Sequence, residues 1–158
     1  MNNYGHLKSK IGECRVLGID YGDKRIGTAI SDIGWIIASP LKVLDNHGAY
    51  KKLFQIISEY EIGVIVVGMP ISLNGENIGM QATKVKKFIS KLEELLVENQ
   101  RSIDLVVWDE RLSSKAAHRV LLECDTSSSY KRNNIDKIAA SFILQGFIDR
   151  IRYYGASF

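Results

Sequence analysis

Carboxylates at three places in the sequence could hold a divalent cation. Asp20 ends one apolar run, Asp109 and Glu110 end another, and Asp136 opens the last expected helix. If these side chains meet at one edge of the fold, they repel one another unless a cation lies between them. Carboxylate oxygens suit Mg²⁺ or Mn²⁺, and paired ions activate a water molecule in phosphodiester cleavage. The set therefore indicates metal-dependent hydrolysis of a phosphate ester.

Each of these acids also has a purely structural explanation. Asp20, before Tyr21 and Gly22, could form an Asx turn that starts a hairpin. Asp136 could stabilise the first turn of a helix through the helix dipole, by about 0.3–1 kcal/mol. Its positions i+3, i+4 and i+7 are apolar, however, so it lies on the face that packs on the core. A carboxylate that faces a core needs compensation.

The pair Asp109 and Glu110 is ambiguous in a different way. Followed by Arg111, the two acids could form a surface ion-pair cluster. Alternation along a strand sends them to opposite faces, so one of them is expected at the site. Both faces of the strand are apolar, and the pattern does not choose between them.

Basic residues close to the carboxylates in sequence could contact a phosphate backbone. They are Lys24, Arg25, Arg111, Lys115, Arg132 and Lys137. Singly, each is also typical of a solvated surface. Four more lysines crowd the polar face of a central helix: Lys84, Lys86, Lys87 and Lys91. The net charge of +3 is too small by itself to demand a nucleic-acid partner.

Apolar periodicity predicts the elements that must position these residues. We expect strands at 15–20, 26–31, 33–44, 62–67 and 103–108, and helices at 50–60, 85–96, 113–121 and 134–147, with a polar loop at 123–134. This order begins as an antiparallel meander and continues as α/β crossovers, which predicts one mixed sheet with helices on both faces. Ligands bind such sheets beyond the carboxyl ends of the parallel strands, where Asp20, the 68–76 loop and Glu110 fall.

The bulk composition is that of a single ordinary globular domain. The chain has 158 residues, of which 46% are hydrophobic and 25% charged. The expected boundaries are a flexible segment at 1–13, one domain at 14–154 and a tail at 155–158. A polar start and the lack of a long apolar run predict a cytoplasmic protein without membrane contact. Cys14 and Cys124 are too far apart for a zinc motif, and reduced thiols are expected.

Four segments together resemble the YqgF family, also called RuvX, of the RNase H-like superfamily. They are GIDYGDKRIGTAISD (18–32), VVGMPISLNGE (66–76), WDERLSS (108–114) and KRNNIDKIAASFILQGF (131–147). The blocks occur in the family's order and spacing and cover nearly the whole chain from residue 14. The resemblance implies an α/β, RNase H-like nuclease domain of the RuvC/YqgF type. Its five-stranded mixed sheet has the order 3-2-1-4-5 with strand 2 antiparallel.

The resemblance also implies a function and a set of site residues. It implies a Mg²⁺- or Mn²⁺-dependent endonuclease acting on structured nucleic acid, most directly in 5′-end processing of pre-16S rRNA. Carried over by position, the catalytic and metal-binding acids are Asp20, Glu110 and Asp136, with Asp109 as the alternate to Glu110. Ala139 stands where RuvC-type resolvases carry a fourth acid, which weakens the four-way junction as substrate.

Three other functions stay open on the sequence. One is a Holliday junction resolvase acting on four-way DNA, and a symmetric homodimer, as opposed to a monomer, would offer such a junction two sites. Another is a nucleic-acid-binding module without catalysis, which retention of all three acids disfavours. A phosphotransferase of the actin and sugar-kinase superfamily would need two such domains, and this chain supplies one.

Overall fold

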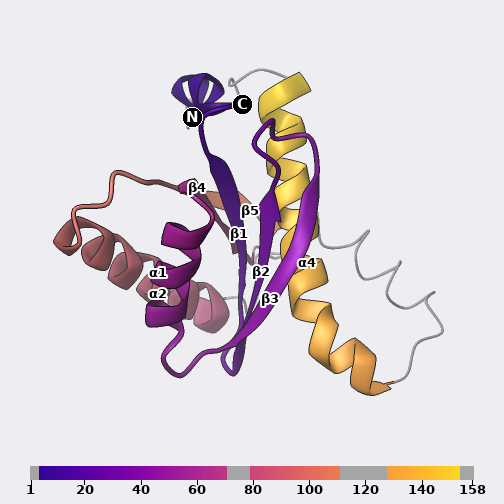
Figure 1. Cartoon of the computed structure of the whole chain (residues 1–158). Helices are drawn as coiled ribbons and strands as arrows, with labels where there is room; N and C mark the ends of the chain where they lie inside the picture. The colour runs from indigo at the N-terminus through magenta and orange to yellow at the C-terminus, as the bar shows by residue number, and fades with distance from the viewer. Residues whose placement is uncertain (1–3, 71–78, 111–127, 154–158) are drawn as a thin grey trace.

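The core of the fold is one five-stranded mixed sheet. The computed structural model describes residues 4–70, 79–110 and 128–153, without the side chains of 128–133. The strands are β1 (Arg15–Tyr21), β2 (Arg25–Ser31), β3 (Ala38–Asp45), β4 (Ile62–Met69) and β5 (Asp104–Asp109), in the order β3-β2-β1-β4-β5 (Figure 1). β2 is antiparallel to both β1 and β3, whereas β4 is parallel to β1 and β5. The predicted strand order and the antiparallel second strand are confirmed.

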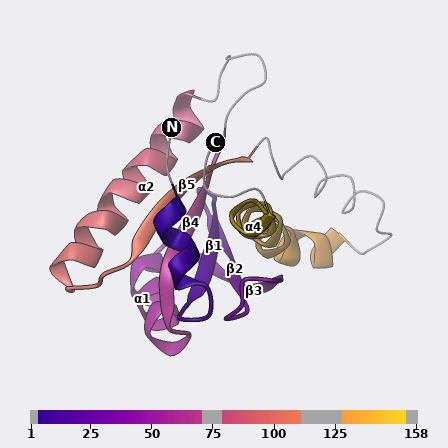
Figure 2. The ribbon, with the colours of Figure 1, turned by 90° about the horizontal axis from the view of Figure 1, so that it is seen from above.

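Helices cover both faces of the sheet, as predicted. Helices α1 (Ala49–Glu59) and α2 (Gly79–Glu98) pack on one face, and α4 (Ser128–Tyr153) packs on the other (Figure 2). We call these the α1/α2 face and the α4 face. None of the described helices has an apolar stretch long enough to span a bilayer.

Alternation along the central strands divides the core into two layers. On β1, Leu17 and Ile19 pack with the helices of the α1/α2 face, whereas Val16 packs with α4. β4 alternates likewise and is apolar on both sides, as expected for a central parallel strand. In β1, in β4 from Val64 on and in β5, even-numbered side chains therefore face α4 and odd-numbered ones face α1 and α2.

The third strand is shorter than predicted. It begins at Ala38, because Asp32 to Ile37 form a turn in which the Asp32 carboxylate accepts hydrogen bonds from three backbone N–H groups. Two isoleucines of this turn, Ile36 and Ile37, are exposed. Their apolar character indicated a buried strand, but the turn is set by the polar side chain of Asp32.

The final helix begins earlier than predicted. α4 starts at Ser128, so the expected polar loop at 123–134 is wrong over its second half. Serine, lysine and asparagine give no apolar period, and the pattern marks the helix only where it packs on the sheet. Asp136 consequently lies in the third turn, where the helix-dipole explanation for it no longer applies. The helix expected at 113–121 lies outside the described residues.

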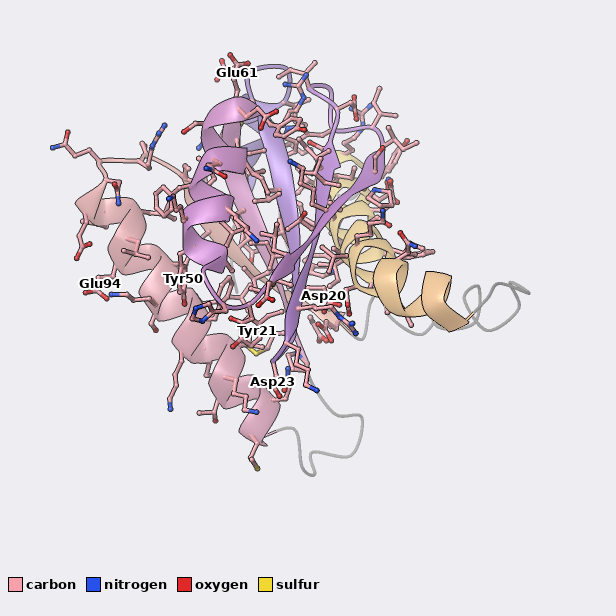
Figure 3. The ribbon with its side chains drawn as sticks, turned by 60° about the horizontal axis from the view of Figure 1, so that its bottom comes forward. Asp20, Tyr21, Asp23, Tyr50, Glu61 and Glu94 are labelled. Atoms are coloured by element: carbon pink, nitrogen blue, oxygen red, sulfur yellow. The ribbon has the colours of Figure 1, made fainter. Side chains whose placement is uncertain are left out.

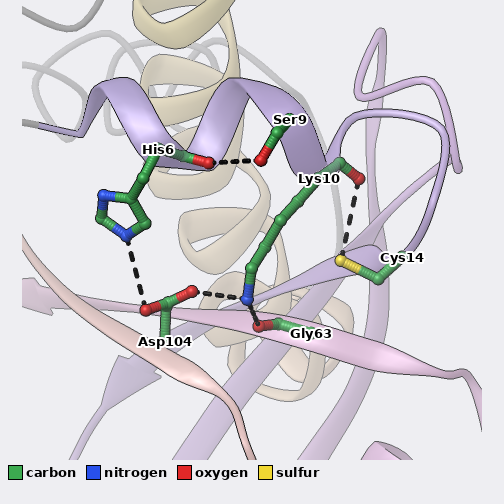
Figure 4. A network of polar contacts seen from close by, with 6 residues as sticks. All are labelled: His6, Ser9, Lys10, Cys14, Gly63 and Asp104. Atoms are coloured by element: carbon green, nitrogen blue, oxygen red, sulfur yellow. Dashed lines mark hydrogen bonds and ion pairs between the residues drawn. The ribbon is translucent and has the colours of Figure 1, made fainter.

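The segment before β1 also differs from the flexible segment expected at 1–13. Residues Gly5–Lys10 form the 3-10 helix η1, and Leu7 is fully buried in the α4-face core. The ammonium of Lys10 lies 2.5 Å from Asp104 and donates a hydrogen bond to the carbonyl of Gly63 (Figure 4). These contacts hold η1 against the amino ends of β4 and β5. Cys14 is a free thiol, and Cys124 lies outside the described residues.

Candidate active site

Asp20 lies at the carboxyl end of the central strand β1, on the α4 face. Val16 and Gly18, which share its parity, contact the core under α4. Its neighbour Tyr21 points to the other face and packs on Phe88 of α2, with ring centroids 4.8 Å apart. The packing of Tyr21 thus fixes the strand end so that the Asp20 carboxylate faces α4.

Asp136 reaches the same place from α4. The register pairs Asp20 with Gly27 of β2, and a Cβ atom on Gly27 would collide with the backbone carbonyl of Asp136. Glycine at 27 is therefore needed for α4 to cross β2 beside Asp20. The guanidinium of Arg25 donates a hydrogen bond of 3.2 Å to the Asp136 carboxylate.

Glu110 is the third carboxylate on the α4 face. It directly follows β5 and shares the parity of Val106 and Trp108, which pack under α4. A Cβ atom on Gly68 would lie 2.7 Å from Oε1 of Glu110 and 2.6 Å from Ile143 of α4. Glu110 and α4 thus lie over Gly68, at the carboxyl end of β4.

Asp109 has the opposite parity, which directs it to the α1/α2 face. The pKa of Asp20 is raised to about 8, first by burial and then by the charges of Glu110 and Asp136. Asp109 is not among the charges that act on Asp20, whereas it does act on Glu110. The structure therefore brings Asp20, Glu110 and Asp136 together and leaves Asp109 outside this group.

The group is electrostatically unfavourable on its own. Burial, followed by the charge of Asp109, raises the pKa of Glu110 as well. No ion pair joins Asp20 to a cation within the described part of the chain. Partly buried carboxylates that repel one another are stabilised by a cation, and an all-oxygen donor set suits a hard ion such as Mg²⁺. The residues present fit such an ion.

The carboxylates are nevertheless not packed as a finished metal cage. Among the side chains that the structure describes, no three His, Cys, Asp or Glu residues are grouped closely enough to hold an ion unaided. Mg²⁺ keeps several waters and commonly takes further ligands from substrate phosphates. An open group of this kind therefore suits an ion that binds together with a phosphate.

The predicted basic residues are only partly described. Lys24 and Arg25 lie exposed in and after the β1–β2 turn, and Lys137 is half-buried on α4 next to Asp136. Arg132 belongs to α4 without a described side chain, and Arg111 and Lys115 lie outside the described residues. Asp20 and Asp23 of the β1–β2 turn lie at one end of the molecule, opposite Glu61 (Figure 3).

Sequence reasoning missed two glycines that make room for this group. Gly27 allows α4 to approach β2, and Gly68 allows Glu110 to lie over β4. A glycine inside a strand was the available signal, because it often marks a close approach of backbone or ligand. A hollow of about 330 Å³ between β3 and α1, lined by Lys42, Lys52 and Glu59 among others, does not include the carboxylates.

By sequence, the chain matches one protein family and individual proteins that share one name. The family described as "RuvX: Holliday junction resolvase" matches residues 14–150. A protein of Thermoanaerobacter pseudethanolicus (strain ATCC 33223 / 39E), named "Putative pre-16S rRNA nuclease", is 42% identical over 139 residues, covering 85% of this chain and 96% of its own. A protein of the same name from Bacillus cereus (strain AH187) is 40% identical over 141 residues, covering 86% and 98%.

Solved structures give the same fold at much lower identity. The RuvC of T. thermophilus in complex with a Holliday junction substrate matches with a TM-score of 0.58 at 13% identity, covering 89% of this chain and 98% of that one. The yeast mitochondrial Holliday junction resolvase Ydc2 matches with a TM-score of 0.54 at 15% identity, covering 98% and 90%. At such identities the likeness shows the fold alone, which is RNase H-like.

Proposed function

The chain belongs to the RuvX family, and from this premise we propose that it is a Mg²⁺- or Mn²⁺-dependent endonuclease that processes the 5′ end of pre-16S rRNA. The observation that carries the proposal is the group of Asp20, Glu110 and Asp136 at the carboxyl edge of the sheet, with the pKa of Asp20 raised to about 8. The names of the relatives at 40–42% identity support the choice of RNA precursor as substrate.

Asp20, Glu110 and Asp136 would hold the metal ion, and Asp109 would not. When bound, the ion would activate water and stabilise the charge that develops on the phosphate. Asp20 sits on the central strand, whose end is fixed by the packing of Tyr21 on Phe88, and so provides a rigid ligand. Arg25 orients Asp136 through the 3.2 Å hydrogen bond and limits its rotation toward solvent.

The basic residues would bind the phosphate backbone on either side of the cleaved bond. Lys24 lies in the turn after β1, which carries Asp20, Arg25 begins β2, and Lys137 follows Asp136 on α4. Arg111, Lys115 and Arg132 belong to the same proposal on sequence position. Contacts to phosphates position the substrate without reading its sequence.

The test compares the wild-type protein with Asp20→Asn on two substrates. An end-labelled pre-16S rRNA leader and a four-way DNA junction are each incubated with Mg²⁺, with Mn²⁺ and with EDTA. We expect metal-dependent cleavage of the RNA that Asp20→Asn abolishes. Symmetric cutting of the junction without RNA cleavage would make the protein a resolvase, and binding of both without any cleavage would make it a binding module.

A further inference from the structure

In both helices of the α1/α2 face the basic residues precede the acidic ones. On α1, Lys51 and Lys52 occupy the first turn and Glu59 is the last residue. On α2, the lysines lie between 84 and 91, and the glutamates are Glu93, Glu94 and Glu98. Both helices therefore show the same change of charge along their length.

Both basic halves lie at the carboxyl edge of the sheet, where Asp20 is. α1 starts just after β3, and Asn46 between them donates hydrogen bonds to the carbonyls of Lys24 and Gly22 in the β1–β2 turn. Lys84 of α2 forms an ion pair of 2.9 Å with Asp23 of the same turn. In Figure 3, Glu61 lies at the opposite end from Asp20, and Glu94 lies on the part of α2 away from Asp23.

An aromatic stack joins the basic halves to the strand that carries Asp20. Phe88 of α2 packs on Tyr21 at 4.8 Å and on Tyr50 of α1 at 5.6 Å. Lys87 and Lys51 are the sequence neighbours of Phe88 and Tyr50. The stack therefore joins the parts of α1 and α2 that carry exposed lysines. We call these lysines the lysine platform and define it as Lys51, Lys52, Lys86 and Lys87.

The charges of the platform are available to a ligand. All four lysines are exposed, and none forms an ion pair with a side chain that the structure describes. The neighbours Lys84 and Lys91, in contrast, are paired with Asp23 and Glu94.

Helix stability does not explain this arrangement. The helix dipole favours acids in the first turn and bases in the last, and neither α1 nor α2 has any. Lys51 and Lys52 stand in the first turn of α1, and Glu59 and Glu98 close the two helices. The order of charges along each helix is thus opposite to the order that the helix dipole would favour. It concentrates positive potential at the carboxyl edge of the sheet.

We propose that the lysine platform binds the phosphate backbone of the substrate outside the cleavage position. The nucleic acid would cross the carboxyl edge of the sheet, from the carboxylates on the α4 face to the platform on the α1/α2 face. The inference rests on the proposed nuclease function, because it names a second contact surface for the same substrate. Lysine contacts of this kind add affinity and salt dependence without sequence specificity.

The experiment uses charge reversal at the platform and, as a control, at the other end of the molecule. The variants are Lys51→Glu/Lys52→Glu, Lys86→Glu/Lys87→Glu and the control Lys8→Glu/Arg101→Glu, which alter the net charge equally. Binding of a labelled RNA stem with single-stranded flanks, and of a four-way DNA junction, is measured in EDTA by fluorescence anisotropy over a range of salt concentrations. Single-turnover cleavage at saturating substrate and thermal unfolding are measured in parallel.

For each platform variant we expect the slope of log affinity against log salt to fall by about two, with no change in the control. Cleavage at saturation should match the wild type, because the carboxylates are untouched. Lys51→Glu/Lys52→Glu should melt at the wild-type temperature or above it, because acids in a first turn are favoured. A lower affinity without a lower melting temperature indicates that the lysines contact the substrate.

Two outcomes would overturn the inference. The first is an affinity of the platform variants equal to that of the wild type. The second is a loss of affinity in the control variant equal to that in the platform variants, which would show a general effect of net charge. Neither outcome touches the proposed function, which depends on cleavage and on Asp20. Conversely, binding that depends on the platform without any cleavage would remove the nuclease proposal and leave the contact surface in place.

Discussion

The two ends of β5 each carry a carboxylate, and the two surroundings are opposite. At the amino end, burial disfavours the charged form of Asp104, but the ammonium of Lys10 at 2.5 Å and the imidazole of His6 at 3.5 Å outweigh it, and the pKa is lowered. Just past the carboxyl end, burial and the charge of Asp109 raise the pKa of Glu110. The pKa of Asp20, which lies two strands away at the same edge, is raised to about 8.

The difference separates a carboxylate whose cations come from its own chain from the carboxylates of the proposed metal site. Asp104 obtains its cations from η1 of the same chain, and the result is a fastened N-terminal segment (Figure 4). The group around Asp20 is held in a state that costs free energy while it lacks a further cation. Such strain is maintained at functional sites, where a ligand from outside relieves it.

The largest effect should come from removing the charge of Asp20. Asp20→Asn keeps the shape of the side chain, so the protein should fold, but metal-dependent cleavage should fall by about a thousandfold or more, equivalent to several kcal/mol. Cleavage rates and circular dichroism check this. Asp109→Asn is the matched control, because Asp109 faces the other side, and its rate should stay within a few-fold of the wild type. Equal losses in both variants would contradict the assignment.

A steric change at Gly68 should have the next largest effect. In Gly68→Ala the new Cβ atom would lie 2.7 Å from Oε1 of Glu110, so the carboxylate must move. A displacement of about 1 Å at a reacting centre can cost on the order of a hundredfold in rate. The double variant Gly68→Ala/Glu110→Asp, compared with Glu110→Asp alone, separates the causes. The shorter acid avoids the contact with the carboxylate, and the contact with Ile143 at 2.6 Å involves only the end of a flexible side chain, so the added methyl group should lower the rate little further. An unchanged rate in the single variant would show that Glu110 is not needed where it lies.

The contributions of Asp20 and Asp104 to the free energy of unfolding should change with pH in opposite directions. Because the pKa of folded Asp20 is raised above its unfolded value, the metal-free protein is stabilised at low pH and loses that stability as pH rises from about 4 to about 8. In EDTA at pH 8, Asp20→Asn should be more stable than the wild type, on the order of 2 kcal/mol or less after solvent screening. Denaturant unfolding at pH 4 and pH 8 measures this, and Mg²⁺ should shrink the difference. A wild type that is the more stable at pH 8 in EDTA would contradict the electrostatics.

The smallest effect is expected at the amino end of β5. Asp104→Asn removes a half-exposed ion pair with Lys10, which should cost about 1 kcal/mol or less at neutral pH. Because the pKa of Asp104 is lowered in the folded state, this contribution is present above its unfolded value and disappears as pH falls below it. Unfolding at pH 7 and pH 3 tests the sign, and cleavage should be unchanged. A loss of cleavage would mean that the two ends are coupled.

Much of this molecule could be predicted from its apolar pattern. The runs that became β1, β4 and β5 are rich in apolar residues, and those of β1 and β5 end at acidic residues on the carboxyl edge of the sheet. Asp20, Glu110 and Asp136 were therefore identifiable as candidates, and their role as metal ligands stays a prediction. The pattern failed at 32–37, where one carboxylate sets a turn, and at 128–134, where a helix has no apolar period.

Which face of the sheet Asp109 and Glu110 each occupy was decided only by the tertiary structure. Periodicity states that a residue is buried, but in a sheet covered on both sides it does not state which helix covers it. α4 covers the face of Val106, Trp108 and Glu110, and the closeness of Asp136 to Asp20 follows from the crossing of α4 over Gly27. The sequence by itself determined which residues end the strands; long-range packing decided which of them share a face, because no local pattern records the partner across the sheet.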